Sequence, residues 1–304
     1  MVQELGKTGL GVSRIALGCM RMASLDDKAA QAVVETALEQ GITFFDHADI
    51  YGGGASERRF AMAMKGLKVD REAIMLQSKC GIRKGYFDFS KEHIVASVDA
   101  ILSRLETDYL DVLALHRPDA LMEPEEVAEA FSELKAAGKV RYFGVSNQNT
   151  YQIELLQSYL SEPLVVNQLQ LSPVHTPLID AGLHVNMKEA AAIVRDGSVL
   201  DYCRLKKMTI QAWSPFLIDL QKGTFMNHPD YGRLNQTISR LADQYHVSRE
   251  AIVVAWIMRH PAKIQTVVGS MNPARLEKIA EAEKIVLTRA EWYEIYTSAG
   301  NSLP

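Results

Sequence analysis

Short apolar runs alternate with segments of helical periodicity along the chain, and this alternation constrains the fold more than any other feature. A strand followed by a helix and another strand requires a parallel sheet. Eight such units are the number in a closed (β/α)8 TIM barrel, which is the fold we predict. The runs are rich in β-branched and aromatic residues, and we assign the strands to residues 15–17, 43–45, 74–77, 109–115, 140–145, 164–169, 209–213 and 265–268.

The boundaries of the remaining elements support one barrel domain over residues 1–304. Apolar residues recur on one helical face in segments 27–40 and 93–105, and a first-turn proline opens a third helix, 124–137. We expect an N-terminal β-hairpin that turns at residues 6–9 and an extra C-terminal helix at 288–299. Two long connections, residues 172–198 and 217–232, are expected to serve as lids or pocket walls.

Charge and cysteine content exclude several classes of protein. The chain has 33 Lys and Arg against 37 Asp and Glu, so its net charge of -4 provides no general attraction for nucleic acid. Three widely spaced cysteines, Cys19, Cys80 and Cys203, fit a reducing compartment better than a disulfide framework. With no secretory signal and no uninterrupted apolar stretch for a membrane span, we expect a cytoplasmic protein without a membrane partner.

Polar residues stand at the downstream ends of the predicted strands. Asp46 ends the run ITFFD, Lys79 ends IMLQSK, His116 ends YLDVLALH, and Ser146 with Asn147 ends VRYFGVSN. In a (β/α)8 barrel these strand ends converge on one face, where the catalytic groups of such folds lie. We therefore expect these side chains to share one site.

The order of these residues resembles the aldo-keto reductase family, in particular its bacterial oxidoreductases. The resemblance rests on DHADIYGGGASE at 46–57, on Lys79 and His116, and on GSMNPARLEK at 269–278. It implies a barrel that reduces aldehydes and ketones with a nicotinamide nucleotide and without a metal. It assigns the role of general acid to Tyr51, with Lys79 and Asp46 tuning it and His116 orienting the carbonyl.

Elementary electrostatics is consistent with this assignment. The pKa of a free phenol is about 10, and lowering it to about 7 takes about 4 kcal/mol. One ammonium at about 4 Å supplies roughly that energy at an effective dielectric constant of about 20. Lys79 is therefore sufficient to act on Tyr51, and it needs a carboxylate partner, Asp46, to keep its charge when buried.

The resemblance also implies contacts with the nucleotide. The nicotinamide amide would lie against Ser146, Asn147 and Gln168, and its ring would stack on the indole of Trp213. The remaining expected contacts, along the ribose, the pyrophosphate and the adenosine end, are Met20, Arg21, Asp46, Ser214, Pro215, Phe216, Leu217, Gly269, Ser270, Met271 and Arg275.

The adenosine end favours NADPH over NADH. Pro273 marks the first turn of a helix whose N-terminus is an anion site, and Arg275 supplies donors suited to a 2'-phosphate. Gly269 departs from the pattern, because many NADPH-dependent members of the family carry Lys there.

Two further motifs in the sequence are incomplete. GKT at residues 6–8 lacks the first glycine of a phosphate loop, and His47 with Asp49 has no metal-ligand spacing, so we expect no metal. Two alternatives remain open: a nucleotide-sensing binding subunit with slow turnover, or an alcohol dehydrogenase working in the oxidative direction. Neither the physiological substrate, beyond a small carbonyl compound, nor the oligomeric state is indicated by these residues.

Overall fold

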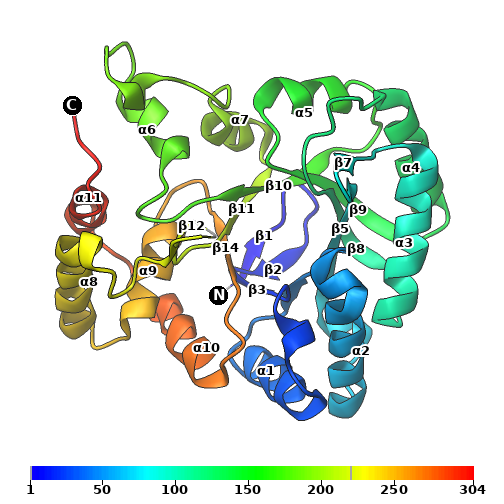
Figure 1. The fold of residues 1–304 in the computed structure, drawn as a ribbon, viewed down its shortest axis with the longest axis horizontal. Helices are drawn as coiled ribbons and strands as arrows, with labels where there is room; N and C mark the ends of the chain where they lie inside the picture. Colours follow the sequence, from blue (N-terminus) through cyan, green and yellow to red (C-terminus); the bar gives the residue numbers. More distant parts are fainter. Residues whose placement is uncertain (1, 220) are drawn as a thin grey trace.

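Eight parallel strands close into a barrel in the computed structural model, which describes residues 2–219 and 221–304. Leu220, within the predicted connection 217–232, lies outside the described residues, as does Met1. All eight predicted strands are confirmed (Figure 1). In chain order they are β3 (Ile15–Gly18), β4 (Phe44–Asp46), β5 (Met75–Cys80), β8 (Leu110–Leu115), β9 (Val140–Ser146), β10 (Leu164–Gln170), β11 (Thr209–Trp213) and β14 (Gln265–Val268).

Helices surround the barrel and connect successive strands. Segments 27–40 and 124–137 are helical as predicted, but the helix expected from residue 93 begins at Lys91, because the Ser90 hydroxyl caps it by accepting from the His93 N–H. The helices are α1 (Asp27–Glu39), α2 (Ala55–Leu67), α3 (Lys91–Leu105), α4 (Pro124–Ala136), α5 (Thr150–Gln157), α6 (Pro177–Leu183), α7 (Val199–Lys206), α8 (Gly232–Tyr245), α9 (Arg249–Met258), α10 (Pro273–Ala280) and α11 (Arg289–Ser298).

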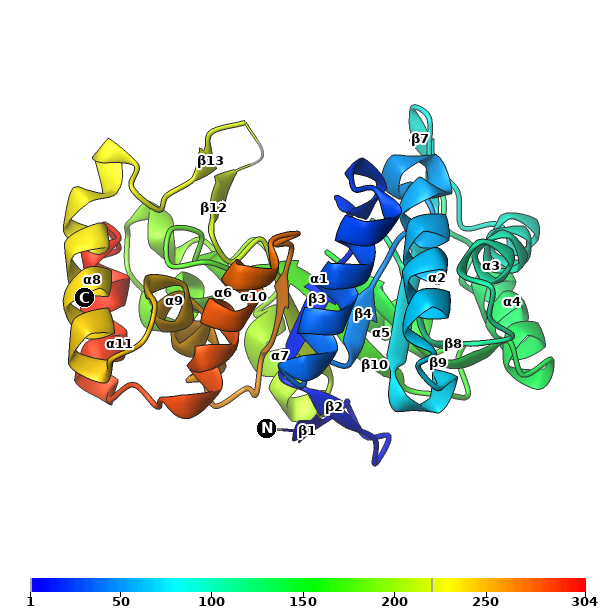
Figure 2. The same ribbon diagram turned by 90° about the horizontal axis from the view of Figure 1, so that it is seen from below.

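Three short hairpins lie at the two ends of the barrel. The predicted N-terminal hairpin is formed by β1 (Val2–Glu4) and β2 (Gly11–Ser13) and lies across the N-terminal ends of the strands (Figure 2). At the opposite end, β6 (Ile82–Arg83) pairs with β7 (Tyr86–Phe87), and β12 (Leu217–Asp219) pairs with β13 (Gly223–Thr224). The first hairpin therefore closes the N-terminal end of the barrel. The β6–β7 and β12–β13 hairpins stand beside its open C-terminal end.

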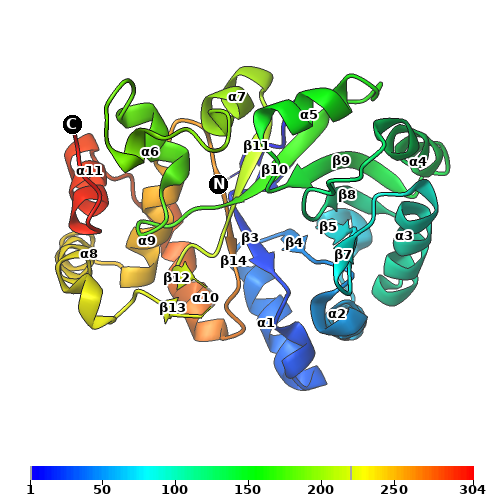
Figure 3. The same cartoon turned by 45° about the horizontal axis from the view of Figure 1, so that its top comes forward.

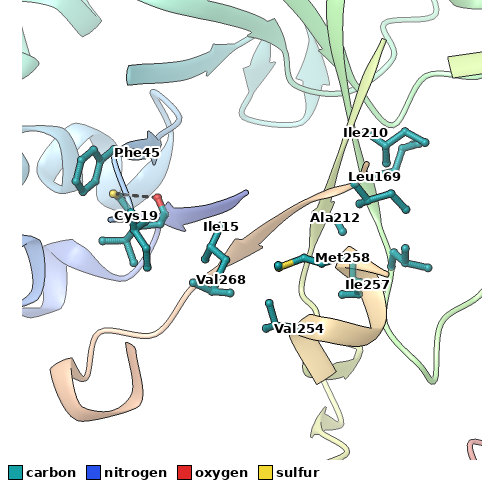
Figure 4. Packing of buried hydrophobic residues seen from close by; sticks show 14 of the residues in the cluster. Ile15, Cys19, Phe45, Leu169, Ile210, Ala212, Val254, Ile257, Met258 and Val268 are labelled. Carbon is teal, nitrogen blue, oxygen red and sulfur yellow. Dashed lines mark hydrogen bonds between the residues drawn. The ribbon is translucent and has the colours of Figure 1, made fainter. Parts of the chain in front are cut away.

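The core has two parts, because alternate residues of each strand face opposite sides of the barrel wall. Outward-facing Ile15 of β3 and Val268 of β14 lie against Val254 and Met258 of α9 (Figure 4). Inside the barrel, a smaller cluster joins the N-terminal hairpin to the strands through Leu5, Val12, Phe44, Val112 and Val166. Full burial of such a side chain contributes about 1.5 to 3 kcal/mol.

The predicted C-terminal helix is α11, which begins one residue after its cap, Thr288. It lies beside α8 at the edge of the molecule (Figure 3). The indole rings of Trp292 on α11 and Trp256 on α9 stack with centroids 5.0 Å apart, and each Nε1 donates to the backbone oxygen of the other residue at 3.0 Å. This reciprocal pair fixes α11 on the barrel.

The two long predicted connections contain regular structure of their own. Connection 172–198 forms α6 and leads into α7, and the two helices lie side by side (Figure 3). Connection 217–232 forms the β12–β13 hairpin and leads into α8. Within residues 2–219 and 221–304, no helix is long and apolar enough to cross a membrane.

Candidate active site

A cavity of about 740 Å³ opens at the C-terminal ends of the barrel strands. Lys79 is buried behind this lining, and Met271 packs against the hydrophobic core instead of the cavity. The other predicted site residues all line it: Met20, Arg21, Asp46, Tyr51, His116, Ser146, Asn147, Gln168, Trp213, Ser214, Pro215, Phe216, Leu217, Gly269, Ser270 and Arg275.

A buried ion pair forms the base of the cavity. The Nζ of Lys79 on β5 donates to Asp46 Oδ1 on β4 at 2.5 Å and to the backbone oxygen of His47 at 2.7 Å. Burial by itself lowers the pKa of Lys79, but the charges of Asp46 and Tyr51 and their hydrogen bonds raise it above its ordinary value. The ammonium is therefore retained although the side chain is only 1% exposed.

Tyr51 lies directly over this pair. The Lys79 Nζ is 5.3 Å from the centroid of the phenol ring, and the His116 ring meets the same phenol edge-on with centroids 6.0 Å apart. Burial raises the pKa of Tyr51, Lys79 lowers it, and the Asp46 carboxylate raises it again, so the net direction is upward. A lowered pKa, expected from the charge of Lys79 alone, is therefore wrong, because burial and the Asp46 carboxylate outweigh that charge. The phenol keeps its proton at neutral pH.

His116 is a neutral imidazole. Burial, then the charges of Lys79 and Arg117, lower its pKa to about 2. The ring lines the cavity. It can therefore hydrogen-bond a group there without bringing a positive charge.

Three consecutive glycines shape the turn that carries Tyr51. This turn is η2 (Tyr51–Gly54), where Gly52, Gly53 and Gly54 have φ values of 59°, 60° and 84°. A Cβ on Gly54 would meet Arg104 Cδ at 2.6 Å, because the Arg104 Nε donates to the buried Glu57 carboxylate beneath it. Left-handed backbone and close approach together require glycine at position 54.

The polar residues after β9 and β11 form one wall of the cavity. The Ser146 hydroxyl donates to the Gln168 backbone oxygen at 2.9 Å and accepts from Asn147 Nδ2 at 2.7 Å. Asn147 and Ser214 both adopt left-handed backbone, with φ values of 56° and 54°. In this conformation the chain turns sharply after each strand end.

The far end of the cavity is positively charged. Arg275 lies in the first turn of α10, which Asn272 caps by accepting from the Arg275 N–H at 3.2 Å. Arg249 on α9 also lines the cavity, fixed by hydrogen bonds to Asn227 and Asn235. A helix N-terminus with two guanidinium groups suits an anionic group such as a phosphate.

Several lining residues were missed from sequence. Arg117 immediately follows His116, so the rule that selected strand ends could have found it; its guanidinium lies 5.6 Å from the Trp213 ring centroid. Arg249 and Glu250 lie on α9, distant in sequence from the strand ends, and no local pattern marks them. The Glu250 carboxylate is 3.7 Å from Arg275 Nε and so reduces the local positive charge.

The two long connections line different spaces. Residues Gly223, Thr224, Met226 and Asn227 of connection 217–232 line the main cavity, as expected for a wall of the site. Connection 172–198 instead lines an adjoining pocket of about 300 Å³, which shares Arg117, Asn147 and Trp213 with the main cavity.

The lining fits a nicotinamide nucleotide. The lining includes the Trp213 indole, the amides of Asn147 and Gln168, and the guanidinium of Arg275. His116 also lines the cavity, and its neutral ring lies edge-on to the Tyr51 phenol. Within the part of the chain that the structure describes, no group of three or more His, Cys, Asp or Glu is placed to bind a metal ion.

Comparison with known proteins identifies the family. The aldo/keto reductase family model matches residues 14–298. The chain belongs to this family. It is 38% identical to the oxidoreductase YcsN of Bacillus subtilis, with 97% of both chains covered, and 35% identical to a 6-dehydroglucose reductase of Agrobacterium fabrum, with 95% of both covered.

The solved structures agree with the fold. A Bombyx mori aldo-keto reductase in complex with NADP superposes with a TM-score of 0.75 at 21% identity, covering 98% of this chain and 92% of that one. These structures show that the chain has the (β/α)8 barrel of the aldo/keto reductases. Its membership of the family and its relatives named as oxidoreductases and reductases make it an NAD(P)H-dependent oxidoreductase.

Proposed function

We propose that this oxidoreductase reduces aldehydes or ketones to alcohols with NADPH, and that Tyr51 is its general acid. The observation that carries the proposal is the buried Lys79–Asp46 pair beneath the protonated Tyr51 phenol, with neutral His116 beside it at the cavity base. The combination of an acid, a cation that stabilises its conjugate base, and a neutral hydrogen-bonding group is what carbonyl reduction requires.

Each residue of the site has a separate role in the proposed reaction. The bound nucleotide supplies the hydride to the carbonyl carbon. The Tyr51 hydroxyl donates its proton to the carbonyl oxygen, and the Lys79 ammonium stabilises the phenolate that remains. Asp46 keeps Lys79 charged and oriented, and His116 hydrogen-bonds the carbonyl oxygen so that it faces Tyr51.

The nucleotide is bound along the cavity wall in this proposal. Ser146, Asn147 and Gln168 would bind the amide of the nicotinamide, and Trp213 would stack on its ring. Met20 and Arg21 would contact the ribose, and residues 214–217 would contact the pyrophosphate. Gly269, Ser270 and Arg275 enclose the adenosine phosphate, whereas the core position of Met271 gives no support for a contact of its side chain.

A test of cofactor preference uses Arg275. Its guanidinium in the first turn of α10 favours the 2'-phosphate that distinguishes NADPH from NADH. We expect Arg275→Met to raise the KM for NADPH by about 10-fold, the loss of a charge-assisted hydrogen bond, and to leave the KM for NADH nearly unchanged. Equal effects on both cofactors would remove Arg275 from this role.

A substrate panel tests the function itself. Two relatives, 35% and 32% identical to this chain, are named 6-dehydroglucose reductases, so the panel includes this carbonyl sugar beside simple aldehydes and ketones. We expect NADPH oxidation that depends on the carbonyl compound and saturates with it. Tight NADPH binding with no turnover on any compound would support the nucleotide-sensing alternative, and turnover only from alcohol with NADP+ would support the oxidative one.

A further inference from the structure

Four glutamines form a buried polar layer inside the barrel beneath the cavity. Gln77 on β5, Gln168 on β10, Gln211 on β11 and Gln265 on β14 are each at most 4% exposed. Barrel interiors are usually filled by branched apolar side chains, so a polar layer at this depth requires a partner for each amide. The register pairs Gln211 with both Gln168 and Gln265, and it pairs Gln77 with Asp46.

The upper part of this layer joins the amides to the Asp46 carboxylate. The Nε2 of Gln77 donates to Asp46 Oδ1 and to Gln211 Oε1, both at 2.7 Å. The Nε2 of Gln168 donates to the same two oxygens, both at 3.1 Å. Each amide therefore uses one N–H on the carboxylate and the other on Gln211, whose oxygen accepts both with its two lone pairs.

The lower part fixes the direction of every amide. Gln211 Nε2 donates to Gln265 Oε1 at 2.9 Å, and Gln265 Nε2 donates to the Ser13 backbone oxygen at 2.6 Å. A backbone oxygen only accepts, so Gln265 must present its nitrogen to Ser13 and its oxygen to Gln211. Gln211 must then direct its own Oε1 toward Gln77 and Gln168. Only hydrogen-bond donors can pair with that oxygen. The anchor at Ser13 thereby determines that nitrogen atoms face Asp46.

The chain of four amides ends at one oxygen of the Asp46 carboxylate. Asp46 Oδ1 accepts from Lys79, Gln77 and Gln168 together. The Gln77 amide donates to both Asp46 Oδ1 and Gln211 Oε1. Among the described residues, its own buried Oε1 has no hydrogen-bond partner. Donors of this kind restrict where the carboxylate points.

We infer that Gln77 and Gln211 are positioning residues for the reductase site, acting on Tyr51 through the Asp46–Lys79 pair. The inference rests on the proposed function, because it takes the roles of these three residues from it. Gln77 donates to Asp46 and to Gln211, and Gln211 keeps its bonds to Gln168 and Gln265 when Gln77 is replaced. Gln211 has a second effect, because it also orients Gln168, whose side chain reaches the cavity at the proposed nicotinamide amide site.

Two variants separate these effects. Gln77→Met preserves the length of the side chain and removes both N–H donors, and we expect kcat to fall by about 10- to 100-fold with the Kd for NADPH within about 2-fold of wild type. Gln211→Met should lower kcat similarly and also weaken NADPH binding by about 10-fold, because Gln168 loses its orienting acceptor.

A matched control tests for general damage to the barrel. Thr266 on β14 is fully buried beside Gln265 but belongs to no part of the chain of amides, and among the described residues its hydroxyl has no partner. Thr266→Val should leave kcat, KM and the Kd for NADPH within about 2-fold of wild type, since it removes no hydrogen bond.

A pH profile gives a readout that a purely structural role would not change. In Gln77→Glu the introduced carboxyl is buried beside Asp46, and both burial and the neighbouring charge keep its proton on at low pH. That proton restores one donor to Asp46. We expect kcat relative to wild type to exceed that of Gln77→Met at pH 5.5 and to fall steadily toward pH 8.5.

One native group beside the Asp46–Lys79 pair titrates within this range. Burial raises the pKa of Asp49 to about 6, and Asp49 interacts with Lys79, but this titration is common to wild type and to both Gln77 variants and cancels in kcat relative to wild type.

The titratable groups that interact with Asp46 itself are Lys79, Tyr51 and Cys19, and the pKa of each is raised, so all three keep their protons across this pH range. His116 and His47, with pKa values lowered to about 2 and about 3, stay neutral. A change with pH that is confined to Gln77→Glu therefore reports the introduced carboxyl.

The outcomes distinguish this inference from the proposed function. If Gln77→Met and Gln211→Met keep wild-type kcat while Tyr51→Phe loses it, the positioning role is wrong and the proposed function stands. If Gln77→Met fails to fold, the pH profile of Gln77→Glu decides, and a loss of kcat that does not vary with pH overturns the inference. If Tyr51→Phe also keeps wild-type kcat, the proposed function itself fails.

Discussion

The side chains of Asp46 and Lys79 are 3% and 1% exposed, which makes their ion pair the most deeply buried charge pair described in the molecule. Removing one member of a buried pair leaves the other charge without compensation, at a cost of about 3 to 5 kcal/mol. We expect Lys79→Met to lower the free energy of unfolding by about that amount, and also to abolish most turnover. Urea denaturation followed by fluorescence measures the first effect.

A surface pair provides the control for Lys79→Met. Lys139 and Asp99 also form an ion pair, but their side chains are 37% and 52% exposed. Lys139→Met should change the free energy of unfolding by about 1 kcal/mol or less, because exposed pairs contribute little. Similar losses of unfolding free energy for the two lysine variants would show that the buried Asp46–Lys79 pair contributes no more to stability than the exposed pair.

At the scale of elements, the turn η2 connects the stability of α2 to the position of Tyr51. Gly53 and Gly54 both have left-handed backbone, but a Cβ on Gly53 would meet nothing within 4 Å, whereas one on Gly54 would meet Arg104. Gly53→Ala should therefore show only the backbone cost of about 1 to 2 kcal/mol.

Gly54→Ala should be more damaging than Gly53→Ala. It must also displace Arg104 from the buried Glu57 carboxylate, so we expect a larger loss of stability and a lower kcat, because the turn before α2 moves with Tyr51. Thermal unfolding and steady-state kinetics on both variants compare them directly. Equal losses of stability would mean that the contact with Arg104 is accommodated without disturbing Glu57.

Elements with strong periodicity were predictable from sequence, and short ones were not. The eight strands and α11 were found because β-branched runs and helical spacing mark them locally. The strand β12 has three residues and β13 has two, too few for a pattern to emerge, so this segment was predicted only as a long connection. The helix predicted from residue 93 begins two residues earlier, at Lys91, because the cap at Ser90 sets its start.

At the scale of the whole molecule, barrel closure explains which site residues were predictable. Asp46, His116 and Ser146 follow strands, and a closed barrel brings all strand ends to one rim. Arg249 was missed because it reaches the cavity from a helix, and Gln77 and Gln211 were missed because their contact crosses the barrel between β5 and β11, strands that are not neighbours in the sheet. The cytoplasmic location and the single-domain assignment stay predictions.

The pH dependence of folding also belongs to this scale. His47 is fully buried, and burial, then the charge of Lys79, lowers its pKa to about 3. A histidine in the unfolded chain titrates near pH 6.5. Below that pH the unfolded state therefore binds a proton that the folded state does not bind. This contribution to stability is complete above pH 6.5 and is lost as the pH falls toward 3, by about 1.4 kcal/mol per pH unit.

The variant His47→Phe isolates this contribution. The His47 ring packs edge-on against Phe60, and among the described residues neither ring nitrogen has a hydrogen-bond partner. We expect the free energy of unfolding of the variant, relative to wild type, to be higher by about 1.4 to 2 kcal/mol at pH 5 than at pH 7.5. Comparing the two pH values cancels any packing cost, and a difference near zero would contradict the buried neutral state.

The central claim is that Tyr51 gives its proton to the carbonyl oxygen, and the kinetics of Tyr51→Phe test it most directly. Phenylalanine keeps the ring beside His116 and above Lys79 and removes only the hydroxyl. We expect NADPH oxidation with a competent carbonyl substrate to fall by about 100-fold or more, with the Kd for NADPH within about 2-fold of wild type. Wild-type turnover in Tyr51→Phe, with the same substrate and pH, would contradict the claim.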